Sequence, residues 1–289
     1  MQRPTLIPAS TGAHGLATLQ SQGHLGLQGA FTPRDIAELT RELQRVVSLQ
    51  QAVPLPLMEA SVADYGEGWV FQEQLWRRSA WLADWLLEGP PAQLVCRMLQ
   101  RLDVWLLRDQ TYFKRAGSEA TPWHQDGTFI PVDALRSLTM WIPLHPIGPD
   151  ASPMHYRDAS HTSCQLQPCS ESGLDFDGLL EHWLAAGESV SLYDCLEPGD
   201  CLLHDTWCLH GSPQHRQHQS RLAFVVVYGY GEGRLATHHS LNSCGTLLRD
   251  QALLLRRANA DACFADVEEG AWIPGLDTPI VRVSGRILT

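Results

Sequence analysis

A series of short strand patterns, separated by turns rich in Gly and Pro, fills residues 104–231 and restricts the fold more than any other feature. We expect strands at residues 104–107, 110–114, 137–144, 154–157, 190–193, 200–204 and 221–230. Only one helix, at residues 177–186, is expected within this series. Strands that follow one another with so few helices favour a closed or double-sheet β architecture over repeated βαβ units.

Helical patterns flank this region on both sides. Thr32 and Pro33 are typical of an N-cap and a first helical position, and apolar residues at helical spacing extend the predicted helix to about residue 50. Further helices are predicted at residues 73–87, 92–102 and 246–258, and a late strand at residues 281–283. Residues 19–27 indicate a short strand or loop, and residues 54–68 a loop that is either a mobile lid or a long connection.

We therefore predict a single domain over residues 1–289, mainly β with flanking α-helices. Residues 1–103 would form a mostly helical flank, residues 104–231 the β core with the functional site, and residues 232–289 a helix and strand that close the core. Hydrophobic residues make up 44% and charged residues 18% of the chain, a balance that allows one sizeable core.

The charge and the cysteines exclude several classes of function. A net charge of −11 opposes binding to nucleic acid or to an anionic membrane surface, because both rest on Lys and Arg. No apolar segment is long enough to span a bilayer, and no signal-peptide pattern is found. The eight cysteines contain no Cys-x-x-Cys pair, which argues against a zinc ribbon. We expect a cytoplasmic protein with reduced thiols.

Two histidines and an aspartate form a candidate metal site. Side chains two apart in an extended segment point the same way, so His124 and Asp126 can reach one ion together. His210, which follows a strand pattern, is the candidate third ligand. Two imidazoles and a carboxylate suit Fe(II) and leave one face of the ion open. An isolated His-x-Asp pair is weak evidence, since the chain has 13 histidines and 32 acidic residues.

The residues after His210 strengthen this interpretation. Ser212 supplies a hydroxyl, and Arg221, which leads into an apolar strand, supplies a guanidinium whose planar fork matches a carboxylate. If Arg221 points inward, the buried cation needs an anionic partner. A dicarboxylate cosubstrate would provide one.

Together these motifs resemble the phytanoyl-CoA dioxygenase family of Fe(II)- and 2-oxoglutarate-dependent oxygenases. The matching segments are 122–127 (Pro-Trp-His-Gln-Asp-Gly), 141–144 (Trp-Ile-Pro-Leu), 198–200 (Pro-Gly-Asp) and 210–212 (His-Gly-Ser), followed by Arg221 eleven positions after His210 (221 − 210 = 11). The resemblance covers residues 104–231 well and the N-terminal helices loosely. One departure is Ala159, which stands where the family usually has Gly.

The resemblance implies a double-stranded β-helix, that is, a cupin-like jelly roll, and a set of roles. His124, Asp126 and His210 would hold Fe(II), and Arg221 would bind the distal carboxylate of 2-oxoglutarate, with O2 as the second cosubstrate. Cosubstrate contacts are further implied for Ser212, as the hydrogen-bonding neighbour of Arg221, for Trp141, as an aromatic wall, and for Thr111, on a preceding strand.

The substrate side of the site is predicted from residues around the ligands. Trp123, Gln125, Phe129, His155 and Trp207 are candidates for the substrate pocket, with plain packing as the alternative for each. We expect hydroxylation of a small organic metabolite, such as a biosynthetic intermediate. Desaturation, epoxidation or rearrangement are alternatives, as are a non-catalytic metal-binding module and a zinc hydrolase with the same ligands.

Overall fold

Two antiparallel sheets face each other and carry most of the chain. The computed structural model describes residues 1–10, 12–48, 69–133, 136–162, 174–237, 250–264, 266–273 and 280–281. The larger sheet has the order β1 (Ile7–Pro8), β2 (His24–Gln28), β10 (Cys201–Asp205), β7 (Ser137–Pro143), β12 (Arg221–Tyr230), β4 (Val104–Lys114), β3 (Trp69–Glu73). All its pairs are antiparallel except β1 with β2.

The smaller sheet has the order β5 (Thr121–His124), β11 (His210–Ser212), β8 (Met154–Arg157), β9 (Val190–Tyr193). From β4 onward the chain passes repeatedly between the two sheets, with β4, β7, β10 and β12 in the larger sheet and β5, β8, β9 and β11 in the smaller one. This passage between the sheets is the winding of a jelly roll. A third, three-stranded sheet joins β14 (Trp272–Ile273), β13 (Gly233–Leu235) and β6 (Val132–Asp133).

The larger sheet buries both of its faces, as the alternation along β7 shows. Met140 and Ile142 join the core cluster that includes residues of helices α2 (Pro33–Ser48), α4 (Ala80–Leu87) and α5 (Pro90–Leu99). Trp141, between them, joins a cluster with Met154 and Tyr156 of the smaller sheet. The interior between the sheets is therefore separate from the helix-covered face.

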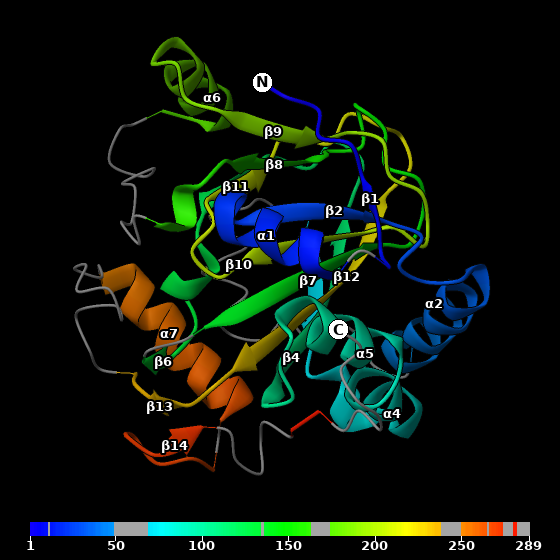
Figure 1. Ribbon diagram of the computed structural model, residues 1–289, viewed down its shortest axis with the longest axis vertical. Coiled ribbons are helices and arrows are strands. Elements are labelled where there is room, and N and C mark those ends of the chain that lie inside the picture. Colours follow the sequence, from blue (N-terminus) through cyan, green and yellow to red (C-terminus); the bar gives the residue numbers. More distant parts are fainter. Residues whose placement is uncertain are drawn as a thin grey trace.

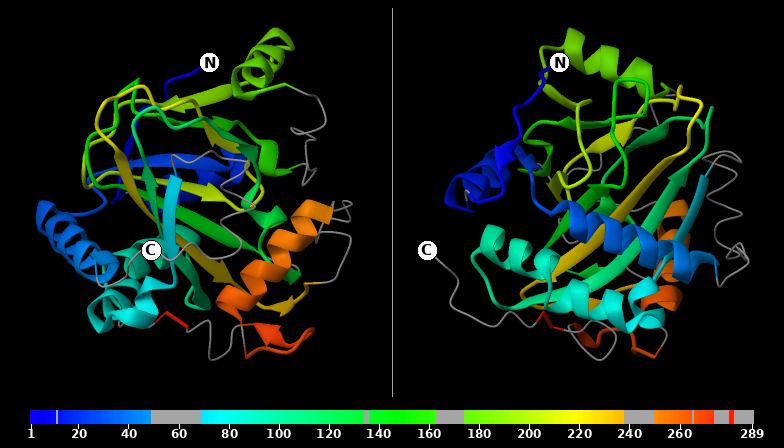
Figure 2. Two further views of the ribbon diagram at one scale, coloured as in Figure 1. Left: turned by 180° about the vertical axis from the view of Figure 1, so that it is seen from behind. Right: turned by 90° about the vertical axis from the view of Figure 1, so that its right-hand side faces the viewer.

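The remaining helices lie around the edges of the sheets. Figure 1 shows α6 (Phe176–Ala185) beside β9, and α7 (Asp250–Cys263) beside β6 and β13. The views in Figure 2 place α4 and α5 together next to the larger sheet. Helix α1 (Gly12–Gln22) packs against α5 and β2. Within the described residues, no helix combines the length and the apolar character needed to cross a bilayer.

Over most of residues 104–231, the predicted strands begin and end within a few residues of the observed strands. The predicted helices that flank this region agree with the structure to a similar degree, with one exception. The predicted helix at residues 73–87 is wrong in its first half. Strand β3 runs to Glu73, Gln74 has a positive φ of 56°, and a short 3-10 helix, η1 (Leu75–Arg78), precedes α4. The carboxylate of Asp109 accepts hydrogen bonds from the backbone N–H groups of Leu75 and Trp76, which ends the strand pairing there.

The N-terminal flank also differs from the prediction. Residues 19–27, predicted as a strand or loop, contain the end of α1 and most of β2. Strands β1, β2 and β3 of this flank complete the larger sheet, and its other described elements are helices. The candidate lid at residues 54–68 and most of the late strand at residues 281–283 lie outside the described residues.

Candidate metal centre and cavity

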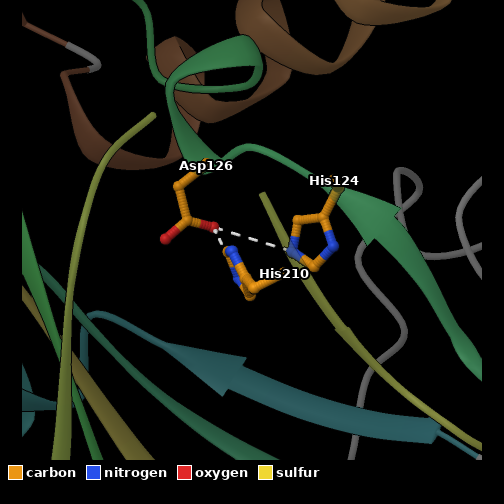
Figure 3. Close-up of side chains that lie close together, drawn as sticks. All are labelled: His124, Asp126 and His210. Carbon is orange, nitrogen blue, oxygen red and sulfur yellow. Dashed lines mark ion pairs between the residues drawn. The ribbon is translucent and has the colours of Figure 1, made fainter. Parts of the chain in front are cut away.

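The three predicted metal ligands converge at one edge of the interior. His124 ends β5, Asp126 begins the 3-10 helix η2 (Asp126–Thr128), and His210 begins β11, where it pairs directly with His124. The Oδ1 atom of Asp126 lies 3.7 Å from Nε2 of His124 and 3.8 Å from Nε2 of His210. Figure 3 shows both imidazoles turned toward the same carboxylate oxygen.

Backbone hydrogen bonds fix which nitrogen of each imidazole faces the site. Nδ1 of His124 donates to the carbonyl of Pro122 (2.8 Å), and Nδ1 of His210 donates to the carbonyl of Cys208 (2.9 Å). A carbonyl oxygen can only accept, so the proton of each neutral ring is on Nδ1. The Nε2 lone pairs of both rings are thus available to an ion.

Asp126 is held by its other oxygen. Oδ2 accepts hydrogen bonds from Oγ1 of Thr139 (2.8 Å) and Nε2 of His204 (3.3 Å), which are register partners on β7 and β10. Nδ1 of His204 in turn accepts from the hydroxyl of Tyr156 (3.1 Å). These contacts leave Oδ1 turned toward the two imidazoles. His204 thus orients the carboxylate of Asp126 without being one of the three candidate ligands.

The protonation states suit metal binding. Burial lowers the pKa of His124 to about 4 and that of His210 to about 4, so both rings are neutral near pH 7. Burial opposes ionisation of Asp126, but the hydrogen bond from His204 and the nearby imidazoles hold its pKa well below the usual range. The site therefore offers two neutral nitrogens and one carboxylate oxygen, a donor set that fits Fe(II). Within the described residues, no other group of His, Cys, Asp and Glu has metal-binding spacing.

Gly127 allows the tight turn after Asp126. A Cβ atom at Gly127 would lie 2.7 Å from Cγ2 of Thr206 and 2.7 Å from the Trp207 ring. Only glycine fits this approach without moving a buried neighbour. The close packing explains why a glycine follows the aspartate here.

The guanidinium of Arg221 lies in the same interior and is nearly fully buried, with 2% exposure. It donates to the backbone carbonyl of Ser152 and lies 5.4 Å from the ring centroid of Trp141, while its Nε atom has no hydrogen-bond partner among the described residues. Burial lowers the pKa of Arg221 to about 10, which keeps it cationic near neutral pH. A buried cation with an unused donor is suited to an anionic ligand.

Ser212 reaches Arg221 only through Ser152. Its hydroxyl hydrogen-bonds with Thr121 (2.8 Å) and Ser152 (3.1 Å), and no direct hydrogen bond to Arg221 is found among the described residues. Lys114, which the sequence analysis did not identify, donates to Ser152 (2.7 Å) and Ser212 (3.3 Å). Burial, followed by repulsion from Arg221, lowers the pKa of Lys114 to about 5. A polar cluster thus supports the guanidinium.

Thr111 is not among the residues that line the cavity. It lies on β4, where side chains alternate between the two faces of the sheet. Its neighbours Gln110 and Tyr112 line the interior cavity, whereas the hydroxyl of Thr111 lies 3.5 Å from the carbonyl of Gln72 on β3. The cavity lining therefore includes Gln110 and Tyr112, one residue to either side of Thr111, and the contact of Thr111 with the cosubstrate stays a prediction.

Most of the predicted pocket residues pack outside the cavity. Trp123 stacks on Phe176 of α6 at a centroid distance of 4.9 Å, and His155 packs edge-on against both rings. The side chain of Gln125 donates to the carbonyl of Trp207 (2.6 Å), whose ring covers Gly127. Trp123, Gln125, His155 and Trp207 are absent from the cavity lining, and their role in a substrate pocket stays a prediction.

Phe129 is a predicted pocket residue whose ring lies beside that of His124. Its ring is half-buried and lies 6.1 Å from the ring of His124. The cavity itself encloses about 500 Å³, including its open mouth. Its lining comprises Arg108, Gln110, Tyr112, Thr121, His124, Asp126, Thr139, Trp141, Met154, His204, His210, Arg221, Val225 and Val227.

Sequence comparison identifies a family and no individual relative. A family model described as phytanoyl-CoA dioxygenase (PhyH) matches residues 19–223. No curated protein matches the chain. The family match spans the three candidate ligands and Arg221.

Several solved structures share the fold. The non-heme alpha-ketoglutarate-dependent carbocyclase SnoK from nogalamycin biosynthesis superimposes with a TM-score of 0.72 at 15% identity, covering 96% of this chain and 100% of SnoK. The epimerase SnoN from the same pathway gives 0.69 at 17% identity, covering 93% and 98%. EctD from S. alaskensis, solved with 2-oxoglutarate and 5-hydroxyectoine, gives 0.56 at 18% identity, covering 80% and 83%. These similarities confirm the predicted jelly-roll fold.

Proposed function

The chain belongs to the phytanoyl-CoA dioxygenase family of Fe(II)- and 2-oxoglutarate-dependent oxygenases, and on that premise we propose that it hydroxylates a C–H bond of a small organic metabolite. One observation carries the proposal: the Nε2 atoms of His124 and His210 face Oδ1 of Asp126, in a cavity that also contains the buried guanidinium of Arg221. A metal site and a carboxylate site in one cavity are what this chemistry requires.

Each residue has a role that follows from its contacts. His124, His210 and Asp126 would hold Fe(II), and Arg221 would bind the distal carboxylate of 2-oxoglutarate beside the ring of Trp141. When bound, iron and 2-oxoglutarate supply the oxidation: O2 and 2-oxoglutarate are consumed, CO2 and succinate are released, and one oxygen atom enters the substrate C–H bond. The protein contributes orientation and an interior that excludes bulk water.

The direct test is succinate formation from 2-oxoglutarate by purified protein with Fe(II), ascorbate and O2, measured without a primary substrate. We expect wild-type protein to form succinate, and His210→Ala and Asp126→Ala to lose this activity. His155→Ala is the matched control, because it removes a buried histidine that pairs with Gly211 on the same sheet but faces away from the ligands. Equal succinate formation by His210→Ala and wild type would contradict the proposal.

A second outcome of the same chemistry is supported by the structural neighbours. SnoK is a carbocyclase and SnoN an epimerase, so this fold also hosts reactions that add no oxygen. Product mass separates the outcomes: hydroxylation adds one oxygen atom, ring closure or desaturation removes two hydrogen atoms, and epimerisation leaves the mass unchanged. A screen of candidate metabolites for products that depend on both O2 and 2-oxoglutarate would identify which applies.

The two remaining alternatives make different predictions in the same assay. A non-catalytic metal-binding module would bind Fe(II) without forming succinate. A zinc hydrolase would turn over its substrate with Zn(II) and without O2. The cationic Arg221 in the cavity weighs against both, since neither needs a buried partner for a dicarboxylate.

A further inference from the structure

We propose that Arg108 binds a carboxylate, or a similar anionic group, on the primary substrate. This inference rests on the proposed function and narrows the substrate to anionic small molecules. It starts from a second buried arginine in the cavity, at a position that none of the family motifs identified in the sequence includes.

The strand register puts Arg108 level with the metal centre. His204 pairs with Thr139, Thr139 with Val227, and Val227 with Arg108, so these residues form one row across β10, β7, β12 and β4. The four strands lie side by side in Figure 1. His204 and Thr139 hold Asp126, and Arg108 is two strands beyond Thr139, a separation of about 10 Å at the usual strand spacing. Its long side chain extends from there into the cavity.

Arg221 occupies a different row. It pairs with Lys114, six residues along β4 from Arg108 (114 − 108 = 6), which corresponds to about 20 Å along the strand. The two arginines therefore serve two separate parts of the cavity. A 2-oxoglutarate molecule that runs from the metal to Arg221 has its distal carboxylate far from Arg108, so that carboxylate and Arg108 are not partners.

The guanidinium of Arg108 has hydrogen-bond donors that no described residue uses. Its side chain is 7% exposed, its Nε atom has no hydrogen-bond partner, and no ion pair or hydrogen bond involving its side chain is found among the described residues. A guanidinium has five N–H donors, and burial without partners is costly. An anion in the cavity would satisfy them.

The acidic and polar neighbours of Arg108 are engaged with one another. Glu73 accepts a hydrogen bond from Nε2 of Gln110 (3.1 Å), and Oε1 of Gln110 accepts one from the hydroxyl of Tyr112 (2.9 Å). Burial opposes the charge of Arg108, yet Tyr112, Glu73, Cys263 and Asp126 together raise its pKa, so it stays cationic. A planar cation fixed between polar side chains matches the two oxygens of a carboxylate.

The test measures binding rather than turnover. Protein saturated anaerobically with Fe(II) and 2-oxoglutarate, so that Arg221 is occupied, is titrated by calorimetry with three matched probe pairs: hexanoate and hexanamide, benzoate and benzamide, phenylacetate and phenylacetamide. We expect at least one carboxylate to bind wild type about tenfold or more tightly than its amide. Arg108→Met should lose this preference, and Arg108→Lys should retain part of it.

Two controls show whether the carboxylate preference comes from Arg108 itself. Arg256→Met removes a buried guanidinium that bonds to the carbonyl of Ala236, outside the cavity, and should keep the carboxylate preference. The dissociation constant of 2-oxoglutarate for the Fe(II) protein should change less than about threefold in Arg108→Met and rise about tenfold or more in Arg221→Met. Thermal unfolding of each variant confirms that it is folded.

Three results would overturn the proposal. They are the absence of a carboxylate preference in wild type with every pair, a preference that persists in Arg108→Met, and a loss of 2-oxoglutarate affinity in Arg108→Met as large as in Arg221→Met. The last result would assign Arg108 to the cosubstrate instead. Failure of the proposed function is seen separately, as absence of succinate formation by wild type, because the binding assay requires no turnover.

Discussion

The Nε2 atom of His204 lies 3.3 Å from Oδ2 of Asp126, whereas the other carboxylate oxygen, Oδ1, faces Nε2 of His124 and Nε2 of His210. His204 is itself held by the hydroxyl of Tyr156 (3.1 Å) and is 1% exposed. A residue that orients a ligand without touching the ion affects metal affinity while leaving the ligand set intact.

We therefore expect His204→Ala to weaken Fe(II) binding about 10–100-fold, because Asp126 would lose one of the two groups that orient it. Anaerobic metal titration of the purified protein measures the change. His155→Ala, which removes a buried histidine away from the ligands, should bind Fe(II) as wild type does. Equal affinities for His204→Ala and wild type would show that Thr139 alone orients the carboxylate.

Gly127→Ala should destabilise the protein and weaken metal binding together. The added Cβ would lie 2.7 Å from both Thr206 and the Trp207 ring, and relief of such overpacking costs about 1–3 kcal/mol. Gly148→Ala is the matched control, since a Cβ there meets only Nε2 of Gln217 at 3.8 Å. Denaturant unfolding compares the two variants, and equal stabilities would contradict the packing argument.

Ala159 occupies the position where the family usually has glycine, and it has a positive φ of 57°. An alanine in this region is strained, so Ala159→Gly should raise the free energy of unfolding by up to about 1 kcal/mol. Ala83→Gly, inside α4, should instead lower it by about 1 kcal/mol, because glycine disfavours a helix interior. Opposite signs in the two variants are the expected result, and destabilisation by both would show that the turn tolerates alanine without strain.

Acid should destabilise the metal-free protein through His210. Burial and the neighbouring His204 lower the pKa of His210 from 6.5 to about 4, so between these values the unfolded chain binds a proton that the folded protein does not. The free energy of unfolding must then fall as pH drops through this window, by up to about 3 kcal/mol for this group. Urea unfolding of metal-free wild type and His210→Gln at several pH values checks this. The variant should depend less on pH, and an unchanged dependence would contradict the assignment.

Local patterns in the sequence predicted much of the fold and the metal site. The run from Arg221 to Tyr230 is one strand as predicted, and the predicted helix from Thr32 onward is α2. His124 and Asp126 lie close because they are two apart along the chain, and His210 could be added from the family motif. These features depend on spacing along the chain, which a sequence displays directly.

The sequence could not show which residues of different strands lie side by side, because this depends on how the strands pair. Lys114 lies beside Arg221, and Arg108 lies in the row of His204, only because β4, β12, β7 and β10 pair in a particular register. Thr111 was chosen as a cosubstrate contact, whereas its neighbours Gln110 and Tyr112 line the cavity, since the face of β4 that points inward is also set by this register. The alternation of Arg108, Gln110, Tyr112 and Lys114 was the available signal for a polar inner face.

The central claim is that one Fe(II) ion binds between His124, Asp126 and His210. Anomalous diffraction at the iron edge, from crystals grown anaerobically with Fe(II), tests it most directly. We predict a single strong peak in contact with Nε2 of His124, Nε2 of His210 and Oδ1 of Asp126. Iron bound elsewhere, or these three atoms directed away from one another around an empty cavity, would contradict the account.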